Sequence, residues 1–403
     1  MNIYIYNCPN TLNYGSMMMG ENFINYYNKV SKKKNKYFVE TTDEINIKRL
    51  VKATGVEQIY PVPMKSLFKV GIKKHDYLLA LFRKKNIISD FIKKIDLVVV
   101  LGGDDFTEDY GWKGPIINAI KFNLLQREGL KIIMLGQTMG PYRFFRKPIM
   151  KRFLKKIDKI YPRDPLTYQY LHSLGLQNIK MTDDLALLPL TRQEEKERTK
   201  EYISFCPSEL IYRYTKDGNR KDWLNFNLFM IDKVMEKYKD KKVVLLAHVL
   251  RPVDVDDRIM VNELYNLIKD KYKDRIICEN KEMYPFEVRN YIQQSLFTIA
   301  SRMHPVISSI QCEIPAIALS YSTKYWGIIG ERYDLEDYII DVRYLDYQEM
   351  KAKFLYLINK IDLEYEEIQI KMREKNKLAE ENILNTLNEI ARLEVANEEV
   401  SNI

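Results

Sequence analysis

The chain has 403 residues, of which 46% are hydrophobic, and its 64 Lys and Arg against 55 Asp and Glu give a formal net charge of +9. The length exceeds what one hydrophobic core usually supports and the apolar content excludes a disordered chain, so two ordinary domains are expected. No segment approaches the roughly 18 consecutive apolar residues of a membrane span, and the N-terminus lacks the apolar region of a signal peptide, which predicts a soluble cytoplasmic protein.

The cysteines and the basic residues are both scattered along the chain. Cys8, Cys206, Cys278 and Cys312 show no metal-ligand spacing, so no metal site is expected. The basic pairs are spread over many segments rather than gathered in one patch, so no nucleic-acid partner is expected. A peripheral contact with the anionic inner face of a membrane is compatible with the net charge and should disappear at high salt.

In the first half, short apolar runs alternate with longer stretches of helical period. This alternation is typical of repeated strand-helix units around a parallel sheet. A helix is expected from about Met17, after the first strand. The predicted strands of this half are 2–6, 36–39, 58–60, 97–101, 131–135, 159–161 and 178–181.

A charged stretch at 191–201 is the predicted linker between two domains. The pattern predicts a Rossmann-like domain over 1–190, a second one over 202–345, and a helical segment over 346–403 that either packs back across the domains or projects. Two doubly wound sheets facing one cleft would place strand-end loops on both walls. The strands of the second series are 202–206, 243–247, 275–278, 296–300, 316–319 and 338–341.

The sharpest group of candidates follows the strand 296–300. Arg302 and His304 stand just before Pro305, the predicted first residue of a helix whose N-terminus would attract an anion. Lys324 follows the next strand and would join them if the two strands are parallel neighbours. The structural alternative is that Arg302 pairs with a carboxylate and His304 packs against the helix. The joint placement of three basic groups favours an anion site.

A second candidate, His248, follows the strand 243–247. A histidine at a strand end acts as a general acid or base when a carboxylate orients it. Asp254, Asp256 and Asp257 follow within the next loop, but two of the three are better explained as caps of the next helix.

Glycine-rich strand ends mark the first half. Gly102 and Gly103 close the strand 97–101 and precede Asp104, and the loop containing Gln137 closes the next strand. Such glycines let a ligand approach the backbone, but neither loop is a nucleotide-binding fingerprint. Arg163 follows a third strand, where it either binds an anion, the favoured interpretation, or pairs with a neighbouring carboxylate, Asp164.

Taken in chain order, these loops resemble the polysaccharide pyruvyl transferase family over about residues 10–330. Two positions depart from the family pattern: Ser16 replaces an aspartate, and Asp104 often corresponds to a third glycine, which puts acceptor recognition in doubt. The shared features are Asn-x-Gly (Asn13, Gly15), Gly-Gly (Gly102, Gly103), Gly-Gln-x-x-Gly-Pro (Gly136, Gln137, Gly140, Pro141), Arg-Asp (Arg163, Asp164), Asp-x-Ala (Asp184, Ala186), a strand-end His (His248), and Arg-x-His followed by Ile-Pro and Tyr-x-x-Lys (Arg302, His304, Ile314, Pro315, Tyr321, Lys324).

The resemblance implies a GT-B-like fold and transfer of pyruvate from phosphoenolpyruvate to sugar hydroxyls, forming a ketal in a cell-surface glycan. Phosphoenolpyruvate would be a co-substrate, no cofactor would be needed, and the acceptor would be a sugar or a lipid-linked glycan. The alternatives are a GT-B glycosyltransferase that uses a nucleotide sugar and a catalytically silent glycan-binding protein of the same fold. The implied roles are donor binding for Arg302, Lys324 and Arg163, acid or base for His304, His248 and Asp104, and acceptor or cleft loops for Asn13, Gly15, Gly102, Gly103 and Gln137.

Overall fold

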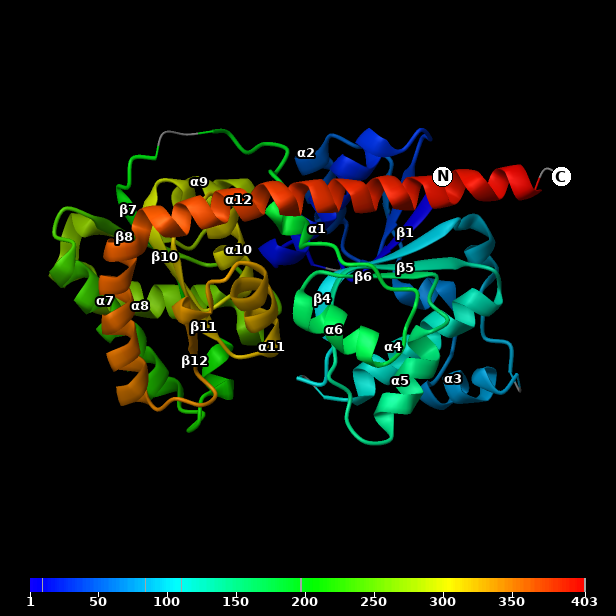
Figure 1. Cartoon of the computed structure of the whole chain (residues 1–403), viewed down its shortest axis with the longest axis horizontal. Coiled ribbons are helices and arrows are strands. Elements are labelled where there is room, and N and C mark those ends of the chain that lie inside the picture. Colours follow the sequence, from blue (N-terminus) through cyan, green and yellow to red (C-terminus); the bar gives the residue numbers. More distant parts are fainter. Residues whose placement is uncertain (9, 84, 110, 196–197, 402–403) are drawn as a thin grey trace. The chain divides into compact units, whose positions relative to one another are not determined.

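Figure 1 shows the computed structural model, which describes residues 1–8, 10–83, 85–109, 111–195 and 198–401, with backbone alone from residue 394. The chain divides into two compact units. Unit 1 contains residues 1–11, 16–185 and the chain from Ala379 onward, and unit 2 contains residues 12–15 and 186–378. Residues 186–190, expected in the first domain, lie in unit 2, where Arg289 donates to the carbonyls of Ala186 and Leu188.

Unit 1 is a parallel six-stranded sheet with the strand order β3-β2-β1-β4-β5-β6. This is the doubly wound order in which ligand-binding loops follow the carboxyl ends of the central strands. Its strands are β1 (Asn2–Tyr6), β2 (Lys36–Val39), β3 (Ile59–Pro61), β4 (Leu97–Phe106), β5 (Lys131–Met139) and β6 (Lys159–Pro162). Its helices are α1 (Tyr14–Val30), α2 (Glu44–Thr54), α3 (Lys74–Leu81), α4 (Lys113–Arg127), α5 (Arg146–Leu154) and α6 (Pro165–Ser173).

Unit 2 repeats the same topology. Its sheet has the order β12-β11-β10-β7-β8-β9, again all parallel, which read from the other edge is the order of unit 1. The expected pair of Rossmann-like sheets is therefore confirmed. The strands are β7 (Tyr202–Cys206), β8 (Lys242–Leu246), β9 (Ile276–Glu279), β10 (Ser295–Ala300), β11 (Ala316–Ser320) and β12 (Ile339–Asp341). The helices are α7 (Arg220–Lys237), α8 (Asp257–Tyr272), α9 (Pro285–Gln293), α10 (Met303–Gln311) and α11 (Thr323–Tyr325).

The C-terminal segment is one helix, α12 (Tyr347–Ser401). Its first part packs in unit 2, where Phe354 and Leu357 are buried, and its later part packs in unit 1, where Ile383 and Leu387 are buried. Of the two arrangements expected for this segment, packing against the domains is the one observed. No helix in the described residues, α12 included, is both long and apolar enough to cross a membrane.

The predicted strand 178–181 is wrong. Only Ile179 makes an isolated parallel bridge, to Ile160, because the Asn178 side chain donates to the carbonyls of Leu154 and Ile157 and turns this segment into a loop. The helix α1 begins at Tyr14, three residues before the expected start.

Both β4 and β5 continue beyond their predicted ends through glycines that allow a close approach of the two backbones. A Cβ added to Gly102 would lie 2.7 Å from the carbonyl oxygen of Gly136 and 2.7 Å from the sulfur of Met19. Gly136 itself has a φ of +73°, in the region that glycine favours. The packing of β4 against β5 therefore explains these glycines without a ligand.

We expect Gly102→Ala to lower the free energy of unfolding by roughly 1–3 kcal/mol, the usual cost of overpacking, because its methyl group would push β4 from β5. The matched control is Gly114→Ala in α4, where a Cβ meets nothing within 4 Å and should add about 0.5–1 kcal/mol. Urea unfolding of both variants measures the difference. Equal stability of the two would contradict the close approach.

Candidate active site

The junction of β10 and α10 places a helix N-terminus at the carboxyl end of the unit 2 sheet. β10 ends at Ala300, and Arg302 is the N-cap of α10 in extended backbone geometry. The helix begins at Met303, so the predicted start at Pro305 is two residues late. A proline fits there because the first N–H groups of a helix have no partner within the helix. The same unpaired N–H groups and the positive end of the helix dipole favour an anion at this point.

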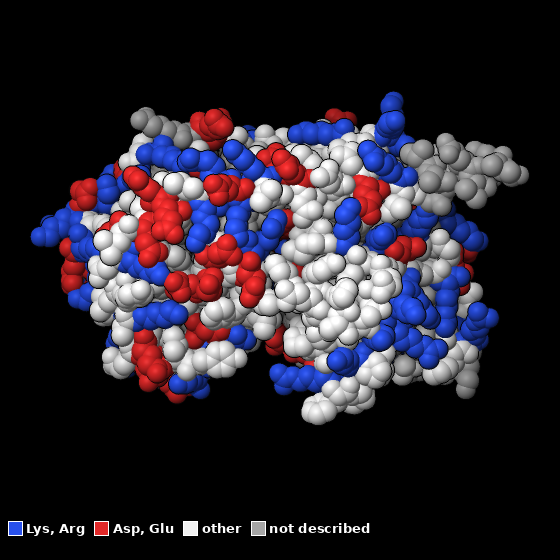
Figure 2. Space-filling view, viewed as in Figure 1, with Lys and Arg blue, Asp and Glu red and all other residues white. Residues whose placement is uncertain are grey.

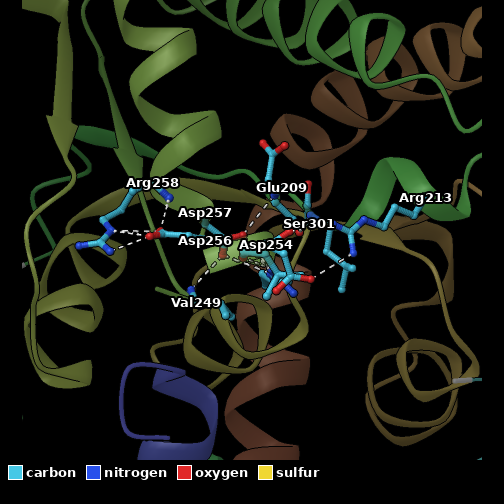
Figure 3. A network of polar contacts seen from close by, with 12 residues as sticks. Glu209, Arg213, Val249, Asp254, Asp256, Asp257, Arg258 and Ser301 are labelled. Carbon is cyan, nitrogen blue, oxygen red and sulfur yellow. Dashed lines mark hydrogen bonds and ion pairs between the residues drawn. The ribbon is translucent and has the colours of Figure 1, made fainter. Parts of the chain in front are cut away.

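The Arg302 side chain pairs with a buried carboxylate, that of Asp257. The Arg302 Nη2 lies 2.8 Å from Asp257 Oδ1, Nε lies 3.2 Å from Oδ2, and Nη2 also donates to the Val255 carbonyl at 3.0 Å. Figure 3 shows the surrounding network, in which Asp257 also accepts the N–H groups of Val249 at 2.9 Å and Glu209 at 3.2 Å. The structural alternative for Arg302, a carboxylate partner, is therefore present in the molecule.

Burial and charge act in opposite directions on this ion pair. Burial raises the pKa of Asp257, while the Arg302 guanidinium and the two backbone N–H donors act against that rise. Burial also acts to lower the pKa of Arg302, but the Asp257 carboxylate outweighs it and the pKa is raised. In the described part of the chain, the Arg302 Nη1 makes no hydrogen bond or ion pair. One edge of the guanidinium can therefore still donate to an anion.

His248 lies just beyond the end of β8 and is buried. Its carbonyl accepts the N–H of Tyr14 at 3.1 Å, and its ring packs edge-to-face on the Tyr14 ring with centroids 5.4 Å apart. Burial, and then the nearby His304, Arg302 and Arg289, lower the pKa of His248 well below its ordinary value. His248 is therefore a neutral imidazole at pH 7, placed in a positively charged surrounding.

The Asn-x-Gly loop contacts His304 within unit 2. Asn13 forms an antiparallel bridge with Val249, which fixes the loop beside the end of β8. A Cβ on Gly15 would lie 2.1 Å from the Nδ1 of His304, so only glycine leaves room for the imidazole in its present position. Gly15 is thus a positioning residue for His304, and both come from segments that the sequence had marked separately.

Lys324 reaches the same strand-end region through α11. β10 and β11 are parallel neighbours, as the expected convergence of their loops required. The Tyr325 hydroxyl donates to the Ser301 carbonyl at 3.3 Å and so joins the two loops. Lys324 is largely buried, with its Nζ 5.2 Å from the centre of the Tyr321 ring. The structure therefore brings the loops of Arg302, His304 and Lys324 together.

Arg163, expected among the donor ligands, is instead an internal residue of unit 1. It is 1% exposed, and its Nη1 lies 2.7 Å from Asp184 Oδ2. Its Nε donates to Thr138 Oγ1 at 3.0 Å, and its Nη2 donates to the Gly103 carbonyl at 3.2 Å. Its partner is not the neighbouring Asp164, which caps α6. The expected donor role of Arg163 is therefore corrected to a structural one.

The remaining candidates of unit 1 differ in whether their side chains are buried or exposed. Gln137 is buried within β5 and donates to the carbonyls of Val100 and Leu101, so its expected place in a ligand-facing loop is wrong. Gly103 has a φ of +129°, and a Cβ there would lie 2.7 Å from Asn7 Nδ2. The Asp104 carbonyl accepts from Thr107 near the end of β4, while its side chain is partly exposed. Within the described ranges, no three His, Cys, Asp or Glu residues gather as metal ligands.

Sequence reasoning missed the carboxylate partner of Arg302. It assigned caps to two of the three aspartates after His248, and Asp256 does cap α8 by accepting the Arg258 N–H. Asp257, the next residue, is buried and forms the ion pair with Arg302. No local signal distinguished Asp257, because an acidic residue in the first turn of any helix is favoured by the helix dipole.

The low pKa of His248 predicts a pH-dependent stability. Below its ordinary value of 6.5 the unfolded chain binds a proton that the folded chain does not, so stability falls as the pH decreases through that value. The loss is at most about 1.4 kcal/mol per pH unit, down to the folded-state pKa. Urea unfolding between pH 7.5 and 5.5 should show this component in the wild type and lose it in His248→Gln. An unchanged slope in His248→Gln would refute the assignment.

Comparison with solved structures identifies the fold class. The UDP-GlcNAc 2-epimerase from Neisseria meningitidis bound to UDP-GlcNAc superposes with a TM-score of 0.59 at 11% identity, covering 98% of this chain and 100% of that one. The UDP-GlcNAc 2-epimerase from Methanocaldococcus jannaschii gives 0.55 at 11% identity, with coverage of 89% and 92%. At these identities the likeness concerns the fold alone, and it confirms the expected GT-B-like class with a C-terminal helix.

Comparison of sequences identifies the family to which the chain belongs. The amylovoran biosynthesis protein AmsJ of Erwinia amylovora is 21% identical over 297 residues, which are 70% of this chain and 69% of that protein. The family described as polysaccharide pyruvyl transferase matches residues 13–323, from Asn13 in the loop beside β8 to Thr323, the residue before Lys324. Because this match spans most of the chain, the chain belongs to the polysaccharide pyruvyl transferase family, and it is a transferase of polysaccharide biosynthesis.

Proposed function

We propose that the protein transfers pyruvate from phosphoenolpyruvate to two hydroxyls of a sugar, forming a ketal in a glycan. The observation that carries this proposal is the strand-end region of unit 2, where Arg302, Lys324 and His304 lie about the N-terminus of α10. Phosphoenolpyruvate has a phosphate and a carboxylate, which suit a helix N-terminus beside two fixed cations. The acceptor is a sugar or a lipid-linked glycan.

The reaction requires one proton to be given and two to be removed. An acid protonates C3 of the enol while a sugar hydroxyl bonds to C2 and loses its proton. The C2–O bond to phosphate breaks, phosphate leaves with the electron pair, and a second hydroxyl closes the ketal at C2. Of the two hydroxyl protons, one balances the proton added at C3 and the other leaves with phosphate. A general acid and a general base are therefore needed.

The residues of unit 2 suit these roles through their charges. Arg302 and Lys324 would bind the anionic groups and stabilise the charge that develops on the leaving phosphate. His304, positioned by Gly15, is the proposed acid or phosphate ligand. His248, kept neutral by its surrounding, can accept a proton or orient the acceptor hydroxyl.

The choice of donor is tested by thermal unfolding with phosphoenolpyruvate, a UDP-sugar and a GDP-sugar. A ligand at about 100 times its Kd adds roughly 2.7 kcal/mol to stability, which raises the melting temperature by several degrees. We expect this rise with phosphoenolpyruvate alone, reduced in Lys324→Gln. A rise with a nucleotide sugar only would support a glycosyltransferase instead. Donor binding without phosphate release in the presence of acceptors would support a silent glycan-binding protein.

The role of His304 is tested by His304→Gln, with phosphate release and melting temperature measured on the same preparation. We expect turnover to fall by roughly 10² to 10⁴ with the fold intact, as is typical for a general acid or base. Gly15→Ala should lower turnover in the same direction, because its methyl group displaces the imidazole. The control His172→Gln should be fully active. A destabilised His304→Gln that keeps near-normal activity per folded molecule would move the acid role to His248.

A further inference from the structure

Unit 1 carries an apolar groove between α3, α4 and α5. The groove has a volume of about 380 Å³. Its walls include Leu78 and Phe82 from α3 and its end, Ile120 from α4, and Ile149 and Phe153 from α5. Phe82 is 71% exposed and Leu78 is 52% exposed. Apolar side chains left open beside a hollow of this kind mark a binding surface rather than an unfinished core.

Three cations border the same groove: Arg127, Arg152 and Lys156. Arg127 donates to the carbonyls of Ala80 and Leu81 at the end of α3. None of the three forms an ion pair with a carboxylate in the described part of the chain. Burial, and then the charges of Arg127 and Arg152, lower the pKa of Lys156. The three positive charges thus disfavour one another, and a bound anion would relieve that repulsion.

The surface that continues from the groove has the same character. α5 contains Lys151 and Arg152 in its last turn and no acidic residue, and Phe144 and Phe145 just before it are 84% and 58% exposed. Figure 2 shows Lys and Arg side chains gathered over the part of unit 1 where Figure 1 places α3, α4 and α5. Exposed aromatic rings between basic side chains are typical of surfaces that lie at the boundary of lipid headgroups and acyl chains.

We propose that this groove binds an acyl chain of an anionic phospholipid while Arg127, Arg152 and Lys156 bind its phosphate, so that this face of unit 1 lies on a membrane surface. A free anion would use the cations but leave the apolar walls exposed to water. An uncharged hydrocarbon would fill the walls but leave the three cations uncompensated. A phospholipid with net negative charge satisfies both halves of the groove.

The test is co-sedimentation of the full chain with vesicles of phosphatidylcholine alone and of phosphatidylcholine mixed with phosphatidylglycerol. We expect binding to the mixed vesicles only, falling with added salt. Arg152→Gln with Lys156→Gln should weaken binding by roughly 30-fold, since each cation near an anionic surface contributes about a fivefold gain in affinity. Leu78→Ser with Phe82→Ser should also weaken it. Melting temperatures check that each variant is folded.

The matched control is Lys32→Gln with Lys34→Gln, which changes the net charge equally at another part of unit 1. It should bind the mixed vesicles like the wild type. An equal loss in this control would overturn the proposal, because the net charge of the whole chain would then explain binding. Full binding by the Leu78→Ser, Phe82→Ser variant, or displacement by inorganic phosphate at constant ionic strength, would overturn it as well.

Discussion

The buried ion pair between Arg302 and Asp257 is the constraint on which the site in unit 2 depends. Asp257 opens α8 and accepts N–H groups from Val249, after β8, and Glu209, after β7, while Arg302 comes from the end of β10. One carboxylate therefore ties together three strand-end loops of one sheet. Loss of either charge would leave the other buried without a partner, at a cost of about 3–5 kcal/mol.

In unit 1, a second buried Arg–Asp pair ties strand-end loops together. Arg163 and Asp184 are both buried, and Arg163 also bonds to Thr138 on β5 and to the Gly103 carbonyl on β4. In each unit an arginine just after a strand holds neighbouring loops through a fork of donors that a lysine lacks: Arg163 follows the edge strand β6, and Arg302 follows the central strand β10. This accounts physically for two arginines of the shared family pattern without assigning both to a ligand.

The basic side chains discussed above differ in whether a carboxylate balances their charge. Arg163 is fully engaged by protein acceptors, and Arg302 is paired yet keeps Nη1 available beside a helix N-terminus. Arg152 and Lys156 border an apolar groove and pair with no carboxylate in the described residues. A guanidinium whose donors are all bonded within the protein positions loops, and a cation that keeps a donor without a carboxylate partner is suited to an anion.

The sequence alone determined the strands and helices that a local pattern of apolar residues predicts. The alternation of short apolar runs with helical stretches predicted both parallel sheets, since a strand buried on two faces needs a continuous apolar run. The only predicted strand that failed, 178–181, was decided by side-chain bonds from Asn178 to carbonyls of the α5 region, more than 20 residues away. The convergence of Arg302, His304 and Lys324 also followed from sequence, because parallel neighbours end at one edge.

Only the tertiary structure decided whether a polar side chain near a strand end bonds to another part of the protein or can face a ligand. Arg163 follows a strand and Gln137 was expected to, yet both side chains are buried and bond to partners from distant segments, Asp184 and the β4 carbonyls. The pairing of Arg302 with Asp257 and the contact of Gly15 with His304 join residues far apart in the chain. Local patterns place a residue at a strand end, but whether it points to a ligand or to another side chain depends on packing that no local pattern records.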